Sequence, residues 1–192
     1  VWWALKQIWE KDLLYHGHKV VPYCPRCGTA LSSHEVAQGY QDVVDESITV
    51  RFRVIGEENT YLTAWTTTPW TLPSNVALVV NPDVDYQLVE ATVAAAGGPS
   101  RYYVAASLAS AVFGDDAYSV IASMKGSELV GKSYEPVFPF ALDRIEKSGK
   151  KAHYVVSDDY VTTEDGTGIV HAAPAFGEDD ARVGRLYDLP FI

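Results

Sequence analysis

Two stretches of the sequence place polar, potentially reactive side chains close together, and the first is rich in threonine. It reads Trp65-Thr66-Thr67-Thr68-Pro69-Trp70-Thr71-Leu72-Pro73-Ser74-Asn75. A strand that runs into Pro69 must stop pairing there, because proline has no N–H to donate, and strand alternation then places Thr66 and Thr68 on one face. Their hydroxyls beside the Trp65 indole could line a small polar pocket. Alternatively, they are β-branched residues at a strand end whose hydroxyls bond locally.

The second stretch combines glycine, histidine and acidic residues. It reads Gly166-Thr167-Gly168-Ile169-Val170-His171-Ala172-Ala173-Pro174-Ala175-Phe176-Gly177-Glu178-Asp179-Asp180. The pattern predicts a glycine turn, a buried strand that ends at His171, and a helix that begins with three acids. Acids in a first helical turn interact favourably with the helix dipole, so a purely structural role also explains them. Likewise, a histidine at a strand end is often a packed, hydrogen-bonded residue.

The third feature is the cysteine pair Cys24-Pro25-Arg26-Cys27. Two thiolates at this spacing can bind zinc, but a closed structural site needs four ligands. A second C-x-x-C does not occur, and the nearby histidines His16, His18 and His34 do not complete a zinc pattern. We therefore interpret Cys24 and Cys27 as a half-site whose other ligands lie outside this chain. A redox pair is less favoured, because the βαβ context of such motifs is missing.

Composition limits the class of protein. The 192 residues include 15 Lys and Arg against 25 Asp and Glu, a formal charge of −10, and 47% are hydrophobic. The charge excludes a strongly basic nucleic-acid binder, and the hydrophobic content excludes a disordered chain. Apolar runs fall short of the ~20 residues that a membrane span needs, and two cysteines do not make a disulfide scaffold. Acids concentrate between Asp158 and Asp188, where most should be solvated and one or two could hold a cationic group.

Periodicity predicts the elements that must position these residues. Residues 2–15 have helical spacing and predict an amphipathic helix that ends near Gly17. Strands are predicted over 47–55, 61–67, 76–80, 86–93, 102–106, 118–122, 153–156 and 169–172, and short helices over 106–113 and 179–189. Ala94–Ser100 is predicted to be a flexible loop. Many short strands with few long helices favour a mixed α/β, β-rich fold, with a partly closed β-barrel core and peripheral short helices.

The chain is expected to have two parts. Residues 1–45 are predicted to form a helix and a cysteine knuckle that lead into a main domain of residues 46–192. The sequence begins in an aromatic segment and ends on apolar residues, so we interpret it as a domain excised from a longer protein. The start shows no charged segment followed by a cleavage site, and a secreted protein is therefore not expected.

Taken together, the two long motifs resemble the editing domain of isoleucyl-tRNA synthetases, and residues 23–32 look like the segment that leads into it. The resemblance extends from about residue 15 to the end of the chain. Related domains for valine and leucine typically have Thr-Thr-Arg-Pro in the first motif and lack histidine at the position of His171. The ATP-handling motifs of the synthetic site are absent, since His16-Gly17-His18-Lys19 and Ser123-Met124-Lys125-Gly126-Ser127 match neither.

The resemblance implies a function in proofreading. The domain would hydrolyse valine wrongly attached to isoleucine tRNA, and valyl-adenylate, within a cytoplasmic isoleucine–tRNA ligase whose synthetic site lies elsewhere. Its partners would be the valine-bearing 3′ end of that tRNA, valyl-adenylate and the remaining domains of the parent enzyme, without a membrane. Editing would need no cofactor, although zinc could bind the parent enzyme through Cys24 and Cys27.

The resemblance also implies roles for individual residues. Asp180 would hold the substrate ammonium, His171 would touch the substrate side chain or the terminal ribose, and Trp65 would wall the pocket. Hydrogen bonds to the ribose, carbonyl or water would come from Thr66, Thr67, Thr68 and Asn75. Two alternatives stay open at this point: a non-catalytic, β-rich module that docks tRNA or holds zinc, and an editing domain of the valyl type.

Overall fold

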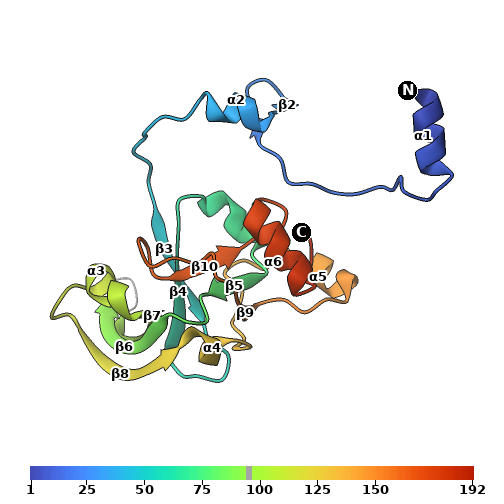
Figure 1. Cartoon of the computed structure of the whole chain (residues 1–192). Helices are drawn as coiled ribbons and strands as arrows, with labels where there is room; N and C mark the ends of the chain where they lie inside the picture. The colour runs from blue at the N-terminus through green and yellow to red at the C-terminus, as the bar shows by residue number, and fades with distance from the viewer. Residues whose placement is uncertain (94–96) are drawn as a thin grey trace. The chain divides into compact units, whose positions relative to one another are not determined.

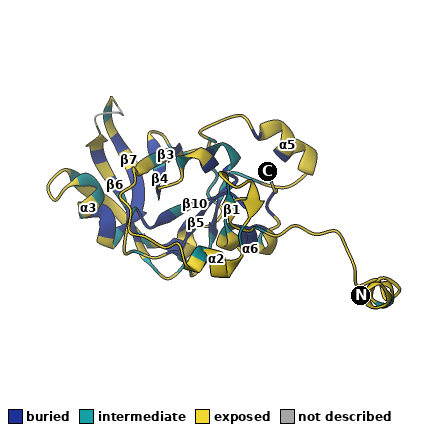
Figure 2. Cartoon of the chain, turned by 90° about the horizontal axis from the view of Figure 1, so that it is seen from above, coloured by how far each residue is buried: buried dark blue, intermediate teal, exposed yellow. Residues whose placement is uncertain are grey.

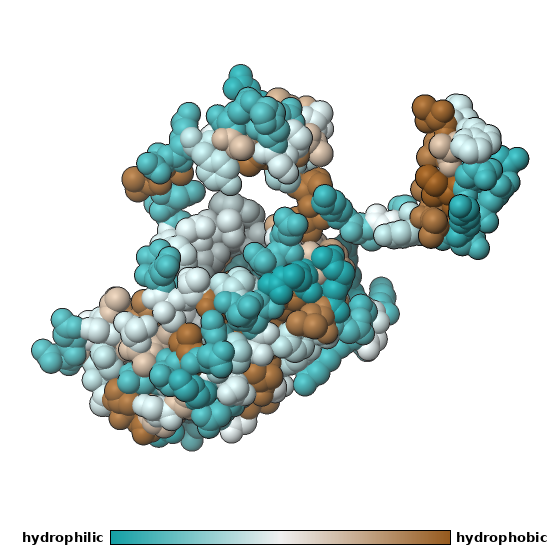
Figure 3. Space-filling model, in the orientation of Figure 1, coloured by the Kyte–Doolittle hydropathy of each residue, from teal (hydrophilic) through white to brown (hydrophobic). Residues whose placement is uncertain are grey.

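The computed structural model describes residues 1–93 and 97–192, and the chain divides into two units, Val1–Gln41 and Asp42–Ile192. Elements of the first unit are the helix α1 (Trp2–Trp9), the hairpin of β1 (Tyr23–Cys24) and β2 (Thr29–Ala30), and the helix α2 (Ser33–Ala37). Residues of α1 are almost all exposed, with hydrophobic groups along one side and hydrophilic groups along the other (Figure 3). Within the described residues, none of the helices has the length and apolarity needed to cross a membrane.

The second unit contains two sheets (Figure 1). The larger sheet has the order β3-β4-β7-β6-β8, and only its β4–β7 pair is parallel. Its strands are β3 (Ile48–Arg53), β4 (Thr60–Thr66), β6 (Asp85–Val93), β7 (Gly98–Ala105) and β8 (Tyr118–Lys125). In the smaller sheet, β5 (Ala77–Val80) lies between antiparallel β10 (Ile169–Ala172) and parallel β9 (Tyr154–Ser157).

Short helices complete this unit. They are η1 (Pro69–Ser74), η3 (Ala106–Leu108), α3 (Ala109–Phe113), α4 (Gly126–Leu129), α5 (Leu142–Ser148) and α6 (Glu178–Leu186). Each strand expected from alternation is confirmed, with shifted boundaries. The predicted loop over 94–100 is partly wrong, because residues 98–100 already belong to β7, whereas 94–96 lie outside the described residues. Helices η1, α4 and α5 were not predicted, since one or two turns are too short to give a helical period.

Two predicted helices end earlier than expected, for the same reason. Asp12 and Asp188 have left-handed backbone angles, with φ of 53° and 50°. The next residue after each closes the helix by a backbone bond, Leu13 N to Ile8 O at 3.2 Å and Leu189 N to Gly184 O at 2.8 Å. This is the Schellman arrangement, in which aspartate occupies the position that glycine usually takes. The apolar period therefore continues beyond the true end of α1 and of α6.

Strand β5 is the centre of the second unit, because it is buried on both faces. Leu78 and Val80 pack into the cluster that includes the larger sheet, whereas Ala77 and Val79 pack into the cluster with α5 and α6. Strand alternation accounts for this division. The result is a three-layer arrangement of larger sheet, smaller sheet and helices (Figure 1), with the buried residues concentrated in the strands (Figure 2).

The expected partly closed barrel is not confirmed. Within the described residues the two sheets remain separate, and they are joined by isolated bridges from Tyr134 to Val54 and from Ser133 to Tyr154. Tyr134 is 1% exposed, and its hydroxyl donates to Asn75 Oδ1 at 2.7 Å. One residue thus connects the end of the larger sheet to the loop before β5.

We expect Tyr134→Phe to destabilise the second unit. The change removes the donor and leaves the buried Asn75 oxygen without that partner, which should lower the free energy of unfolding by ~1–3 kcal/mol. Urea denaturation monitored by circular dichroism measures it. Tyr118→Phe is the matched control, because Tyr118 is only half-buried and its hydroxyl makes no hydrogen bond within the described chain. Equal unfolding midpoints for both variants and the wild type would contradict the prediction.

Candidate active site

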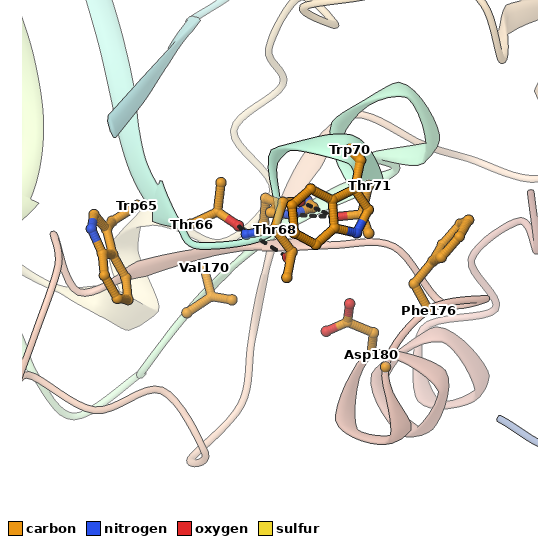
Figure 4. Close-up of a pocket in the computed structure, with 10 residues that line it drawn as sticks. Trp65, Thr66, Thr68, Trp70, Thr71, Val170, Phe176 and Asp180 are labelled. Carbon is orange, nitrogen blue, oxygen red and sulfur yellow. Dashed lines mark hydrogen bonds between the residues drawn. The ribbon is translucent and has the colours of Figure 1, made fainter. Parts of the chain in front are cut away.

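The two motifs singled out from the sequence meet at one pocket of about 310 Å³. The end of β4 and the start of η1 form one side, and β10 with the first turn of α6 forms the other. The pocket is lined by Trp65, Thr66, Thr68, Trp70, Thr71, Val170, His171, Phe176, Gly177 and Asp180. Figure 4 shows the Asp180 carboxylate pointing into the space beside the threonines, with Trp65 and Val170 on the side away from Phe176.

A turn stabilised by its own hydroxyl groups forms the threonine side. Thr68 N donates to Thr66 Oγ1 at 3.0 Å, and the two hydroxyl oxygens lie 3.3 Å apart. Thr66 is buried while Thr68 is exposed, so the pair reaches from the core into the pocket. The sequence also allowed a purely structural role, in which these hydroxyls bond locally. That local bonding is present, and it also orients both hydroxyls toward the pocket.

The imidazole of His171 is held by a threonine that the sequence analysis did not select. Thr71 Oγ1 donates to Thr68 O at 2.9 Å and lies 3.0 Å from His171 Nε2. Since the hydroxyl hydrogen is used, we assign the ring hydrogen to Nε2, which donates to Thr71. Burial lowers the pKa of His171 to about 4. The ring is therefore neutral at pH 7, and its buried Nδ1 has no partner in the described structure.

The carboxylate of Asp180 lies in the first turn of α6 and is partly buried. Its Oδ2 accepts a hydrogen bond from Ala173 N at 2.9 Å, and the other oxygen accepts none within the described residues. Burial raises the pKa of Asp180, and the Ala173 bond opposes that rise. A Cβ on Gly177 would lie 3.2 Å from the Asp180 Cγ, so glycine keeps space open beside the carboxylate. A cation could bind the free oxygen from the pocket side.

An ion pair fixes the helix that presents Asp180. Arg182 donates two hydrogen bonds to Asp158, at 2.7 and 2.8 Å. Asp158 is 9% exposed, and its backbone N donates to Val80 O at the end of β5. The Arg182 bonds hold the pKa of Asp158 below its usual range. Asp158 is thus an exception among the acids of this region, which were expected to be mostly solvated.

Two predicted site residues do not reach the pocket. Thr67 is exposed and is not among the residues that line the pocket. Asn75 is buried, and both ends of its amide are hydrogen-bonded, with Nδ2 donating to Ala77 O at 2.8 Å and Oδ1 accepting from Tyr134. Residues that line the pocket but were not selected are Trp70, Thr71, Val170, Phe176 and Gly177. All five lie within the two motifs, so the motifs as a whole cover the pocket lining more completely than the residues chosen within them.

A second hollow of about 280 Å³ adjoins the pocket and shares Trp65 and Val170 with it. Its floor includes the turn Gly166–Gly168, and both of these glycines have positive φ, 75° and 73°. A Cβ on Gly166 would lie 3.0 Å from the Trp65 side chain, so this turn needs glycine to lie against the indole. Trp65 therefore separates two neighbouring spaces.

The cysteine knuckle belongs to the first unit and is described by itself. Cys27 N donates to Cys24 Sγ at 3.3 Å, and this bond lowers the pKa of Cys24. Both thiols are free. In the described parts of the chain, His, Cys, Asp and Glu side chains nowhere gather in a group of three or more that could hold a metal. The donor set therefore fits half of a four-ligand zinc site.

Comparison with known proteins gives the family. Residues 1–174 match the family model of class I tRNA synthetases (I, L, M and V). The isoleucine–tRNA ligase of Clostridium novyi is 58% identical over 192 residues, and that of Thermoplasma volcanium is 56% identical over 191. Each alignment covers 100% of this chain but 17% of the relative, so the chain spans about a sixth of the length of these proteins.

Solved structures identify the fold. The editing domain of the cytosolic leucyl-tRNA synthetase of P. knowlesi matches with a TM-score of 0.57 and 15% identity, covering 79% of this chain and 66% of that one. The structure named GlLeuRS-CP1 also matches with a TM-score of 0.57, at 18% identity, over 73% of this chain and 59% of that one. The chain therefore belongs to the class I tRNA synthetases of the I, L, M and V group, and it has the fold of their editing domains.

Proposed function

We propose that the chain is the editing domain of an isoleucine–tRNA ligase and removes valine from misacylated isoleucine tRNA, and from valyl-adenylate. The observation that supports this most is the pocket in which the Asp180 carboxylate faces the hydroxyls of Thr66 and Thr68. Such a pocket offers an anion for an α-ammonium group and hydroxyls for an ester or a water. The sequence identity to isoleucine–tRNA ligases favours this group over the valyl type.

The chemistry asks little of the protein, because an aminoacyl ester is already activated. Water attacks the ester carbon, the bond to the ribose oxygen breaks, and the water proton passes to that oxygen. Holding the ester and orienting one water supply the catalysis. Asp180 binds the ammonium through a charge-assisted hydrogen bond, which also favours its ionised form. The Thr68 hydroxyl, positioned by Thr66, bonds the ester or the water.

The adjoining hollow suits the nucleoside that follows the ester. It shares Trp65 and Val170 with the pocket, so a ligand can extend from one space to the other across these two side chains. Tyr160 also lines the hollow, and its buried hydroxyl has no hydrogen-bond partner within the described chain. Valyl-tRNA and valyl-adenylate share two groups. In both, the valyl carbonyl carbon would lie in the pocket and the nucleoside would lie in the hollow. Asn75 then acts by positioning the chain after η1.

Because the chain is acidic, we infer that the rest of the parent enzyme provides most of the affinity for tRNA. With a charge of −10, the chain lacks the positive charge that strong phosphate binding requires. We therefore expect the remaining synthetase domains to deliver the tRNA in the cytoplasm, and this chain to act on its end.

We also propose that Cys24 and Cys27 supply two ligands of a zinc site that other parts of the parent enzyme complete. The knuckle geometry supports it, because Cys27 N already donates to the Cys24 sulfur and favours the thiolate.

Asp180→Asn tests the ammonium site. The amide keeps an acceptor for Ala173 N but has no charge. We expect valyl-tRNA deacylation to fall at least about 30-fold, since truncating one partner of a buried charge pair costs ~2–5 kcal/mol. The thermal midpoint should not change. Asp179→Asn is the matched control in the same helical turn, where the side chain is exposed. Equal, mild losses in both variants would refute the assignment.

Size selection gives a second test. One missing methylene is worth only ~1–3 kcal/mol in a synthetic pocket, and isoleucine against valine is a well-known example. A smaller hydrolytic pocket excludes the larger isoleucine side chain by repulsion, because packing an extra methylene group against rigid walls is unfavourable. We expect the chain to deacylate valyl-tRNA but not isoleucyl-tRNA, and His171→Ala to admit isoleucyl-tRNA. Parallel deacylation of both substrates measures this. Similar rates on both by the unmodified chain would contradict size selection.

The zinc proposal predicts weak binding by this chain alone. Two thiolates leave half of the coordination shell to water, so metal analysis after dialysis should find far less than one zinc per chain. Cys24→Ser should abolish what remains. One zinc per monomeric chain would show that the chain completes the site itself.

A further inference from the structure

A short junction, Asn75 and Val76, carries the chain from η1 to β5. Asn75 caps the C-terminus of η1, the helix that carries Thr71. Val76 N donates to Ala172 O at 3.0 Å, and Ala172 belongs to β10, the strand that carries His171. The junction therefore connects the two elements whose side chains form the bond between Thr71 and His171.

Helix η1 needs support from outside itself, because it is a 3-10 helix of six residues. Helices of this kind have poorer hydrogen-bond geometry than α-helices, and runs longer than about 3–4 residues are uncommon. The carbonyls at the end of a helix have no partner within it, and Asn75 O lies at this end. A group that donates to Asn75 O both satisfies the carbonyl and holds the end of η1 in place.

His153 supplies this group from a distant part of the sequence. Its Nε2 lies 3.2 Å from Asn75 O, and since a carbonyl oxygen can only accept, the ring hydrogen is on Nε2. Histidines near a helix C-terminus bond the last carbonyls in the same way, but His153 is 78 positions away along the chain. The ring is partly buried and is not among the residues that line the pocket.

The backbone of His153 has an uncommon conformation that fixes the direction of the ring. Its φ is 58°, in the left-handed region, which crowds the Cβ of an L-residue. Such a conformation persists only where the surrounding contacts determine it. His153 N donates to Val76 O at 2.6 Å, and His153 O accepts from Tyr134 N at 3.0 Å. The imidazole also packs edge-on against the Tyr134 ring, with centroids 5.8 Å apart.

We propose that His153 is a positioning residue of the active site. Its bond to Asn75 O holds the end of η1, and so keeps Thr71 bonded to His171. Thr68 caps the start of the same helix, so its hydroxyl is placed by the same anchor. The proposal rests on the proposed function, because the reaction that these side chains serve is the proposed hydrolysis.

The carboxylate side of the pocket does not depend on this bond. Asp180 lies on α6, which the ion pair of Arg182 and Asp158 holds in place. Loss of the His153 bond should therefore displace the hydroxyls that bind the ester or the water, while the ammonium site is kept. A change that affects the transition state more than substrate binding lowers kcat and leaves KM nearly unchanged.

Two variants of His153 test the proposal by kinetics. His153→Leu removes the donor, whereas His153→Gln replaces it, because the amide nitrogen of glutamine is as many bonds from the backbone as Nε2. We expect His153→Leu to lower kcat for valyl-tRNA deacylation by about 10- to 100-fold, with KM within about 2-fold of the wild type. His153→Gln should recover most of the loss. An unchanged kcat in His153→Leu, or equal losses in both variants, would overturn the proposal.

Two further variants separate positioning from general destabilisation. Tyr103→Phe is the matched control, because it removes the hydrogen bond of another buried tyrosine, to Glu57 at 2.9 Å, outside the pocket lining. It should lower the thermal midpoint but leave kcat unchanged, and a loss of kcat equal to that of His153→Leu would overturn the proposal. His153→Asn covers the case in which His153→Leu does not fold. Asparagine tolerates a left-handed φ, but its amide is one bond too short to reach Asn75 O, so kcat should fall as in His153→Leu.

A spectroscopic measurement separates this proposal from the proposed hydrolysis. NMR with isotope-labelled histidine reports which ring nitrogen of His171 carries the hydrogen, and how fast that hydrogen exchanges with water, without any turnover. We expect slow exchange of an Nε2 hydrogen in the wild type and in His153→Gln, and faster exchange in His153→Leu. The same exchange rate in all of them would overturn the proposal. The expected pattern in a chain that hydrolyses no valyl ester would support the positioning role and refute the proposed function alone.

Discussion

Strand β5 is buried on both faces and holds the layers of the second unit together. Its alternating side chains join the larger sheet, which ends in the threonine turn, to the helical layer, which presents Asp180. Strand β10 pairs with β5 in a register that places His171 opposite Leu78. A slip of one residue would exchange the orientations of His171 and Val170. Because every residue of β5 is buried, such a slip would disrupt the core, and the core itself therefore fixes the imidazole in the pocket.

The carboxylate side needs a second constraint, because a nine-residue helix can rotate on an apolar surface. Asp158 supplies it at the end of β9, where its backbone bonds to the end of β5 and its side chain binds Arg182 in bidentate geometry. Such pairs add geometric specificity to their energy. Arg182 and Asp180 are two residues apart, so this pair sets the rotation of the turn that presents the carboxylate. Gly177 leaves the space into which that carboxylate projects.

Local patterns predicted the strands and the two motifs that line the candidate pocket, because alternation and motif order can be read from the sequence alone. Three features depended on interactions that these patterns do not contain. The 3-10 helix η1, which begins at Pro69, takes Asn75 out of the pocket and brings Thr71 to His171. Left-handed aspartates end α1 and α6 early. Closure of the sheets into a barrel depends on non-local pairing, and the described residues show two sheets joined by isolated bridges at Ser133 and Tyr134.

The low pKa of His171 gives the pocket a single charge. Among its lining residues, only His171 and Asp180 titrate, and burial keeps the imidazole neutral above about pH 4. An imidazolium there would repel the ammonium that we propose Asp180 binds. The neutrality of His171 also affects the stability of the fold. Below about pH 6.5, the usual pKa of histidine, His171 binds a proton in the unfolded chain but stays neutral in the folded chain. The free energy of unfolding therefore falls as the pH drops toward 4. The burial that makes His171 a rigid, uncharged wall is therefore the same burial that limits the fold at acid pH.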